Sequence, residues 1–320
     1  MELIRNMIKN TRPNIKDTSL DTYTKTIYKL HKHFNTDKDV NNFLFIKDYD
    51  KMMEYLYEKY KDTTVKNILV AIIAFLENDN SDDINILKMK YQNEMEKLRT
   101  KIDDNITDNL KSEKQKANWA TKKELYSVIK TLKNIAEPLL DKEEPTKKEL
   151  DIIQQYIFSI LYSGKDIKPL RNDYANMKIV RDGYIADIDL DYNYLVLGKK
   201  PYFLINEYKT SKRYGSIKLF ITTKQLKDVL VKYVKLLGDE QEYLFLNHSN
   251  KTPITENGLT KYIQKIYQKY LNKSIGPSML RTIYISNTDF NKMSYKQKTK
   301  MAMEMGHSFD IQQKNYLKIE

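Results

Sequence analysis

The sequence of 320 residues contains no cysteine. This absence excludes disulfide bonds, thiolate zinc sites and cysteine nucleophiles, and it is consistent with a reducing intracellular compartment. Glycine is scarce as well, with 8 residues, and none of them belongs to a Gly-rich loop that ends in Gly-Lys-Ser or Gly-Lys-Thr. The sequence therefore gives no indication of an ATP-binding site.

Long apolar runs are also missing. The longest covers residues 68–76, far short of the roughly 18 residues needed to span a bilayer. The first 16 residues carry charges throughout and lack the apolar segment of a secretory signal. We therefore expect no membrane segment and an intracellular location.

Acidic residues are outnumbered by basic ones, 43 to 55, which gives a formal net charge of +12 at pH 7. A surplus of cations attracts polyanions and supplies contacts to phosphate groups. Apolar residues make up 41% of the chain and charged residues 31%, which is typical of a globular protein. The charge favours nucleic-acid binding without establishing it, because a lysine-rich composition also follows from AT-rich coding DNA.

The first third of the chain has the periodicity of helices. Apolar residues recur at helical spacing from Tyr23 to Phe34, with Ser19 as the expected N-cap. Lys25, Lys29 and Lys32 lie between them, so one face of this helix is apolar and much of the rest is basic. Further helices are predicted for residues 49–60, 63–76 and 84–102.

The apolar pattern fades from about residue 106, and residues 111–120 are predicted to link two domains, 1–110 and 121–320. Thr121 and Thr146 each precede a helix, with Glu124 and Glu149 at the capping-box position. Short segments rich in β-branched and aromatic residues follow at 177–180, 186–190, 194–197, 202–208 and 217–221. Helices resume at 223–237, 255–270 and from 277 onward. This pattern predicts a mainly α fold with a small antiparallel sheet, an α+β protein.

The last fifty residues contain three motifs in order. SIGPSMLRTIYIS includes Arg281, MAMEMGHS includes His307, and FDIQQKNYLKI places Tyr316 nine residues after the histidine. Here the sequence resembles the tyrosine recombinase (phage integrase) family, whose catalytic domain ends with an arginine box, a Gly-His-Ser turn and a tyrosine at this spacing. The resemblance implies that Tyr316 is the nucleophile and that Arg281 and His307 bind the scissile phosphate.

Two further positions of the family set lie upstream. The segment PLRNDYANMK is similar to recombinases of large DNA viruses and of their satellite viruses (virophages), which implies the role of the first catalytic arginine for Arg171. The usual glycine turn with arginine two residues later is changed here, because Asp166 follows Gly164 at that spacing. The catalytic lysine belongs on a hairpin of the sheet, where Lys209 is the first choice and Lys212 the alternative.

One position departs from the family pattern. The second arginine box usually reads His-x-x-Arg, but the residue three before Arg281 is Ser278. A serine hydroxyl can donate a hydrogen bond to a phosphate oxygen, but it cannot hold a proton as an imidazole can. Ser278 is therefore predicted to contact DNA and not to act as a general base.

The resemblance implies a metal-independent reaction without a cofactor. Two arginines clamp the phosphate, Tyr316 becomes linked to the 3′ phosphate, and Lys209 protonates the departing 5′ oxygen. It also implies a helical core-binding domain (1–110) that closes with the catalytic domain around double-stranded DNA, with phosphate contacts from Lys25, Lys29 and Lys32. The expected assembly is a homotetramer on paired sites, in the host nucleus or a viral factory if the protein is viral.

Two alternatives to an integrase share parts of this pattern. A type IB topoisomerase uses a similar Arg/Lys/Arg/His/Tyr set to nick and reseal DNA. A DNA-binding protein of the same fold that has lost catalysis would account for Ser278 and for the altered first box. The presence in order of all five residues (Arg171, Lys209, Arg281, His307 and Tyr316) favours a recombinase over the inactive alternative.

Overall fold

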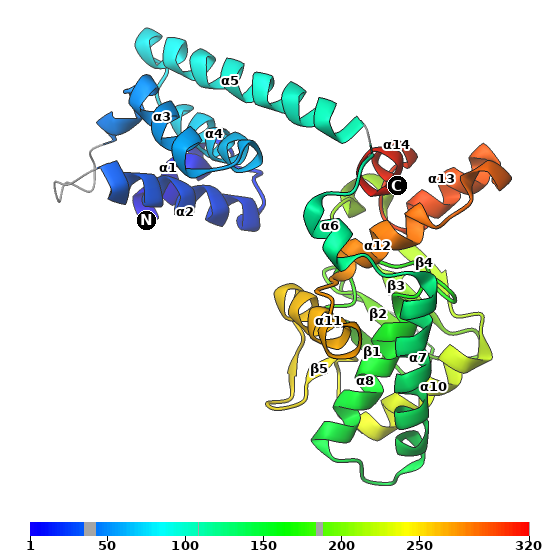
Figure 1. The fold of residues 1–320 in the computed structure, drawn as a ribbon. Coiled ribbons are helices and arrows are strands. Elements are labelled where there is room, and N and C mark those ends of the chain that lie inside the picture. Colours follow the sequence, from blue (N-terminus) through cyan, green and yellow to red (C-terminus); the bar gives the residue numbers. More distant parts are fainter. Residues whose placement is uncertain (35–42, 108, 184–187, 320) are drawn as a thin grey trace. The chain divides into compact units, whose positions relative to one another are not determined.

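The computed structural model describes residues 1–34, 43–107, 109–183 and 188–319. Contacts divide the chain into two compact units, Met1–Asp108 and Asn109–Glu320. Figure 1 shows that helices dominate and that the strands are few and short, which confirms the predicted α+β class. No helix among the described residues has the length and apolarity to cross a membrane.

The first unit is built around one apolar helix. Its elements are α1 (Glu2–Thr11), α2 (Asp17–Phe34), η1 (Leu44–Ile46), α3 (Tyr49–Lys59), α4 (Asp62–Leu76) and α5 (Asp82–Thr107). Helix α4 packs against α1, α2, α3 and α5, and nine of its residues are buried. Burial of a large aliphatic side chain contributes about 1.5–3 kcal/mol, so this central helix supplies much of the unit's stability.

The predicted helices of this unit are present, with two differences. Helix α2 begins at Asp17 and not after Ser19, so the expectation that Ser19 is an N-cap is wrong. An acidic residue in the first turn favours this earlier start, because it interacts well with the helix dipole. Helix α1 was not predicted, although Ile4 and Ile8 are spaced by one helical turn and are both buried.

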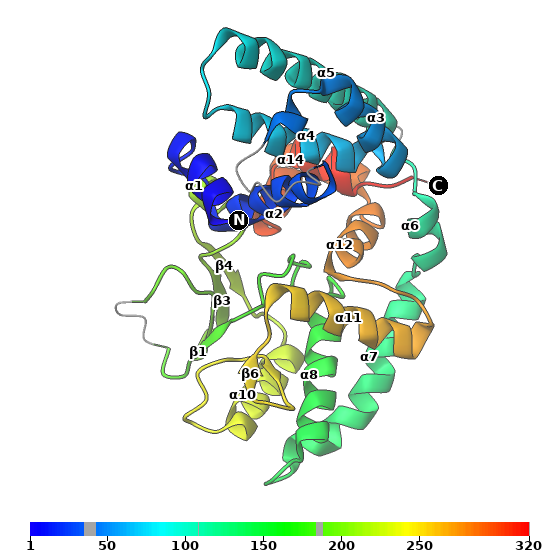
Figure 2. The same ribbon diagram turned by 90° about the vertical axis from the view of Figure 1, so that its left-hand side faces the viewer.

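The second unit contains most of the chain. Its helices are α6 (Glu113–Asn118), α7 (Lys122–Ala136), η2 (Glu137–Asp141), α8 (Lys147–Leu161), α9 (Ser211–Tyr214), α10 (Lys224–Leu237), α11 (Glu256–Leu271), α12 (Pro277–Ser286), η3 (Phe290–Lys292), α13 (Tyr295–Glu304), α14 (Phe309–Ile311) and the π-helical turn η4 (Gln312–Tyr316). Helices α7 and α8 lie side by side, with α11 packed against both (Figures 1 and 2). The capping boxes predicted at Thr121 and Thr146 are both formed.

A four-stranded sheet packs against these helices in the order β1 (Lys178–Val180), β2 (Tyr194–Val196), β3 (Tyr202–Ile205) and β4 (Ile217–Phe220). Alternate residues of β2 and β3 face opposite sides. Leu195 and Phe203 are cross-strand partners that enter the main core. Tyr194 and Leu204, the next partners, form a small cluster on the other face. A separate two-stranded ribbon joins β5 (Leu246–Asn247) to β6 (Thr252–Pro253).

The sheet differs from the predicted one in two respects. Strands β1 and β2 pair in parallel, and only the other two pairs are antiparallel. Of the strand predicted at 186–190, residues 186–187 lie outside the described residues, and residues 188–190 form no strand. The alternation of apolar residues and aspartates in that segment gave a local signal, but no neighbouring strand pairs with its described part.

The predicted linker 111–120 has structure of its own. Helix α6 occupies its centre, and a capping box formed by Ser112 and Gln115 begins the helix. Asn118 accepts a hydrogen bond from the backbone N–H of Ser274 at 2.6 Å, and Lys273 donates to the carbonyl of Trp119 at 2.7 Å. These bonds join the segment to the second unit. The assignment of the two parts of the chain to DNA binding and catalysis stays a prediction.

Candidate active site

One cleft of about 450 Å³ in the second unit gathers residues from five separate elements. Five of the predicted site residues line it: Arg171, Lys209, Ser278, His307 and Tyr316. Arg281 lies beneath, with none of its surface exposed. Lys212, on α9, is exposed and is not part of the lining. Lys25, Lys29 and Lys32 belong to α2 of the first unit, where all three are exposed.

Gly306 forms the turn that holds two walls of the cleft together. It follows α13 and has a φ of +70°, a left-handed conformation that favours glycine. A Cβ atom at this position would lie 3.0 Å from the ring of Tyr208. The Gly306 carbonyl accepts hydrogen bonds from Arg171 Nη1 at 3.0 Å and from Thr210 Oγ1 at 2.9 Å. The turn thus connects the segment after α8 with the segment after β3.

Arg281 projects from α12 into a fully buried position. Its guanidinium donates to the carbonyls of Pro169 and Met305, both at 2.9 Å, and to His307 Nδ1 at 2.7 Å. Its Nε–H has no hydrogen-bond partner among the described residues. Burial lowers the pKa of Arg281, and the neighbouring charge of Arg171 lowers it further. An arginine nevertheless stays charged in proteins, so a permanent cation lies under the cleft.

The contact with Arg281 determines the protonation of His307. Because an arginine can only donate, Nδ1 of His307 is the acceptor and the ring proton lies on Nε2. This Nε2–H is buried and has no partner among the described residues. Burial lowers the pKa of His307 to about 3, with further contributions from the charges of Arg281 and Arg171. The imidazole is therefore a neutral donor at physiological pH.

Tyr316 lies across these groups. Its ring stacks on His307 with a centroid distance of 5.0 Å and an interplanar angle of 21°. The guanidinium carbons of Arg281 and Arg171 are 4.9 and 6.0 Å from the ring centroid. Burial alone would raise the pKa of Tyr316, but the charges of Arg281 and Arg171 outweigh it, so that its pKa is lowered. These two cations therefore favour the phenolate.

The segment around Tyr316 is fixed by its own backbone. Tyr316 ends the π-helical turn η4, in which Leu317 N–H bonds to the carbonyl of Gln312. Ser286 on α12 donates to the carbonyl of Tyr316 at 3.3 Å and accepts from Lys318 N–H at 2.8 Å. Turns of this type are rare and are frequently found at functional sites.

Two side-chain contacts hold the backbone of Arg171. Tyr162, directly after α8, donates to the Arg171 carbonyl, and the Arg171 N–H bonds to the carboxylate of Asp173 at 3.0 Å. Burial raises the pKa of Asp173, although the charges of Arg281 and Arg171 oppose this shift. An ion pair between Lys168 and Glu304 joins the same segment to the end of α13. The segment of Arg171 and the helix that precedes His307 are thus held as one piece.

Sequence reasoning missed three residues of this region. Thr210 bonds to the Gly306 carbonyl, and Arg213 adds a cation to the cleft. Asn193 is buried; its amide donates to the carbonyls of Asp173 and Glu207 and accepts from two backbone N–H groups near β3. The position of Arg213 four residues after Lys209 was a usable signal. Nothing in the local sequence indicates the bonds of Thr210 or Asn193, because their partners are distant in the chain.

Among the described residues, the lining of the cleft contains the cations Arg171, Lys209 and Arg213 and no acidic side chain. Ser278 is exposed there, so its hydroxyl can donate to a ligand. No cluster of three His, Asp or Glu side chains within the described residues could hold a metal ion. Fixed cations, a neutral imidazole N–H and a phenol of lowered pKa suit an anion that is attacked by the phenol oxygen.

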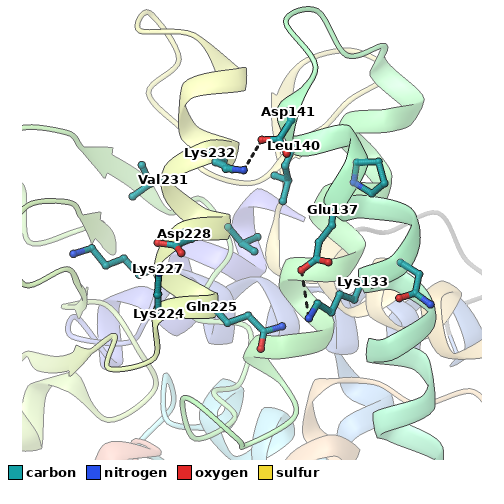
Figure 3. A pocket seen from close by; sticks show the side chains of 13 residues that line it. Lys133, Glu137, Leu140, Asp141, Lys224, Gln225, Lys227, Asp228, Val231 and Lys232 are labelled. Carbon is teal, nitrogen blue, oxygen red and sulfur yellow. Dashed lines mark hydrogen bonds and ion pairs between the residues drawn. The ribbon is translucent and has the colours of Figure 1, made fainter.

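A second, larger groove lies between α10 and the α7–η2 segment. Its volume is about 1120 Å³, and lysines and acidic residues alternate along its walls. Figure 3 shows ion pairs of Lys232 with Asp141 and of Lys133 with Glu137. No predicted site residue lines this groove.

No family model matches the chain, and no curated protein matches it. Among solved structures the chain is similar to one described as the crystal structure of XerA recombinase. The sequence identity is 13% and the TM-score 0.41, over 100% of this chain and 94% of that one. A TM-score of this size carries no argument about function, so the function must be inferred from the residues of the cleft.

Proposed function

We propose that this protein is a site-specific DNA recombinase of the integrase type, which cleaves and rejoins double-stranded DNA through a 3′-phosphotyrosine at Tyr316. The observation that carries the proposal is the contact of one phenol with two arginines and a neutral histidine, in a cleft whose described lining has no acidic side chain. A structural role alone would not require two buried donors, Arg281 Nε and His307 Nε2, that lack partners.

The phosphate would take the place that the phenol now occupies. Arg281 is fully buried and the Tyr316 ring lies over its guanidinium, so the ring must turn away before a phosphate oxygen can reach this cation. Arg171, Arg281 and His307 Nε2–H then stabilise the charge that builds on the non-bridging oxygens. The displaced phenol remains beside the same phosphate, where its oxygen can attack in line.

The reaction exchanges one phosphodiester bond for another. The Tyr316 oxygen bonds to phosphorus, its proton passes to water, and the bond from phosphorus to the 5′ oxygen breaks. Lys209 gives a proton to that 5′ oxygen, which leaves as a hydroxyl. His307 cannot take the phenol proton, because its Nδ1 lone pair accepts from Arg281. In religation the 5′ hydroxyl returns the proton to Lys209 and releases Tyr316.

Double-stranded DNA is the proposed partner. Lys25, Lys29 and Lys32 present an exposed basic face on α2, suited to phosphate contacts that supply affinity and not sequence selection. Ser278 and Lys212 would add contacts beside the cleft. Exchange between two sites requires four active sites, so a homotetramer on paired sites is part of the proposal.

The test is covalent trapping on nicked duplexes in which cleavage releases a short 5′-hydroxyl fragment that diffuses away. The substrates are DNA that flanks the coding sequence and a pool with randomised sequence around the nick. The wild type is expected to form an adduct that survives denaturant, without divalent cations, at Tyr316 by peptide mapping. Tyr316→Phe should form none, because it lacks the attacking oxygen.

Tyr295→Phe is the matched control, because Tyr295 is 74% exposed on the neighbouring helix α13; it should react as the wild type does. Tight binding without any adduct would contradict the proposal and favour a DNA-binding protein without catalysis. An adduct accompanied by relaxation of supercoiled DNA, but by no joining of two substrates, would favour a type IB topoisomerase.

A further inference from the structure

The two residues that flank Lys209 both contact the same glycine. On one side the Tyr208 ring packs against Gly306, where an added Cβ would meet it at 3.0 Å. On the other side Thr210 donates to the Gly306 carbonyl at 2.9 Å. Lys209 lies between them and is exposed at the cleft. Its two neighbours are thus held against the Gly306 turn, while its own side chain is exposed at the cleft.

The rest of the segment is closed on itself. The Tyr208 hydroxyl donates to the Gly215 carbonyl at 2.8 Å, and the N–H groups of Arg213 and Tyr214 bond to the Thr210 carbonyl. Residues 208–215 therefore form one compact piece, whose hydrogen bond to the Gly306 turn comes from Thr210. A compact segment fixed at its base can keep one lysine at a constant distance from the His307 turn.

We infer that Thr210 is a positioning residue that holds Lys209 at the leaving oxygen through its hydrogen bond to Gly306. The inference rests on the proposed function and deepens it, because it selects Lys209 over Lys212 as the proton donor. Lys212 is exposed on α9 outside the lining of the cleft. The Gly306 carbonyl also binds Arg171 at 3.0 Å, so Thr210 could instead act on the phosphate clamp, and the experiment must separate these roles.

A substrate with sulfur in place of the bridging 5′ oxygen distinguishes an effect on the proton donor Lys209 from an effect on the phosphate-binding residues. A thiol has a pKa near 8.5, far below that of an alcohol, so sulfur leaves without a proton and makes the general acid unnecessary. With the oxygen substrate, Lys209→Ala is expected to slow adduct formation by about 10²-fold or more and Thr210→Val by about 10-fold. With the sulfur substrate both variants should react within twofold of the wild type.

Several variants make the result specific. Thr210→Ser keeps the hydroxyl and should retain wild-type rates, and Thr222→Val makes the same replacement at an exposed position outside the cleft. The double variant Lys209→Ala/Thr210→Val should be no slower than Lys209→Ala, because the two changes remove one function. Thermal unfolding of Thr210→Val should be cooperative, which shows that the variant is folded.

Equal slowing of Thr210→Val on both substrates would overturn the inference. It would show that Thr210 acts through the phosphate-binding residues Arg171 and His307 and not through Lys209. The inference would also be overturned if the sulfur substrate restored the rate of adduct formation to Lys212→Ala and not to Lys209→Ala. If the wild type forms no adduct with the oxygen substrate and none with the sulfur substrate, the proposed function itself is overturned, and this inference with it.

Discussion

The cleft and the groove of Figure 3, both in the second unit, differ in how their cations are neutralised. In the groove of Figure 3, Lys232 and Lys133 are paired with carboxylates that share their solvent exposure. Beneath the cleft, Arg281 is fully buried and donates to two backbone carbonyls and to a neutral imidazole. The groove has the larger volume, about 1120 against 450 Å³.

This difference shows that volume is a poor guide to function. Exposed ion pairs contribute about 0–1 kcal/mol and are screened by salt, so the charges of Lys133 and Lys232 are largely neutralised where they stand. The carboxylate of Asp173 offsets part of the charge of buried Arg281, but the partnerless Nε–H of this guanidinium is costly unless an acceptor arrives. The smaller cleft is therefore the better site for a phosphate.

The largest expected contrast is between Arg281→Ala in the cleft and Lys232→Ala in the groove. Loss of Arg281 leaves three buried acceptors without a donor, at about 1–3 kcal/mol each, and removes a cation from the phosphate site. We expect adduct formation to fall on the order of 10²–10³-fold and the free energy of unfolding to fall by several kcal/mol. Lys232→Ala should change stability by at most about 1 kcal/mol and leave the adduct rate within twofold.

Arg281→Lys is the second variant, since it keeps a charge but loses the planar fork that reaches several acceptors. Trapping assays and urea unfolding at 10 °C measure both effects. Wild-type adduct formation by Arg281→Lys would show that a point charge is sufficient and that the network around Arg281 is not needed.

A smaller effect is expected from the titration of His307. Burial first, and then Arg281 and Arg171, lower its pKa to about 3 in the folded protein, against about 6.5 when unfolded. Between these values the unfolded chain binds a proton that the folded chain does not. The stability contributed by neutral His307 is therefore complete above pH 6.5 and is lost as the pH falls toward 3, by at most about 1.4 kcal/mol per pH unit.

The measurement is urea unfolding of the wild type and His307→Gln at pH 7 and pH 5. The wild type should lose more stability than the variant between these two values. An identical loss in both would mean that the imidazole is not held neutral, and the difference between cleft and groove would then rest on Arg281 alone.

Local features of the fold could be predicted from the sequence because their causes are local. The capping boxes at Thr121 and Thr146 lie within four residues of the chain, and both are formed. The apolar face of α2 could also be predicted, although the predicted first residue of the helix was wrong. The parallel pairing of β1 with β2 could not be predicted, because it depends on where residues 16 positions apart meet.

Five residues that line the cleft could be predicted from the sequence, but its geometry could not. Spacing connected His307 with Tyr316, but nothing local indicated that Arg281 would be fully buried or that Tyr316 would stack on the imidazole. Thr210 bonds to a glycine 96 positions away, and Asn193 joins the segments of Arg171 and Lys209. Such contacts are properties of tertiary packing. The catalytic roles of the five residues stay a prediction.

The smallest expected effect is on the salt dependence of DNA binding. It is measured with two double variants, one in the cleft and one in the groove, that remove the same charge. The cleft variant Lys209→Ala/Arg213→Ala and the groove variant Lys224→Ala/Lys227→Ala each remove two positive charges from the lining. Each lost phosphate contact lowers the slope of log K against log salt concentration by about 0.9. We expect the cleft variant to lower the slope by about 1–2 and the groove variant to leave it unchanged, in fluorescence-anisotropy titrations of duplex DNA from 50 to 200 mM salt. Equal losses in both variants would show that DNA responds to net charge alone, and a larger loss in the groove would place the duplex across α10.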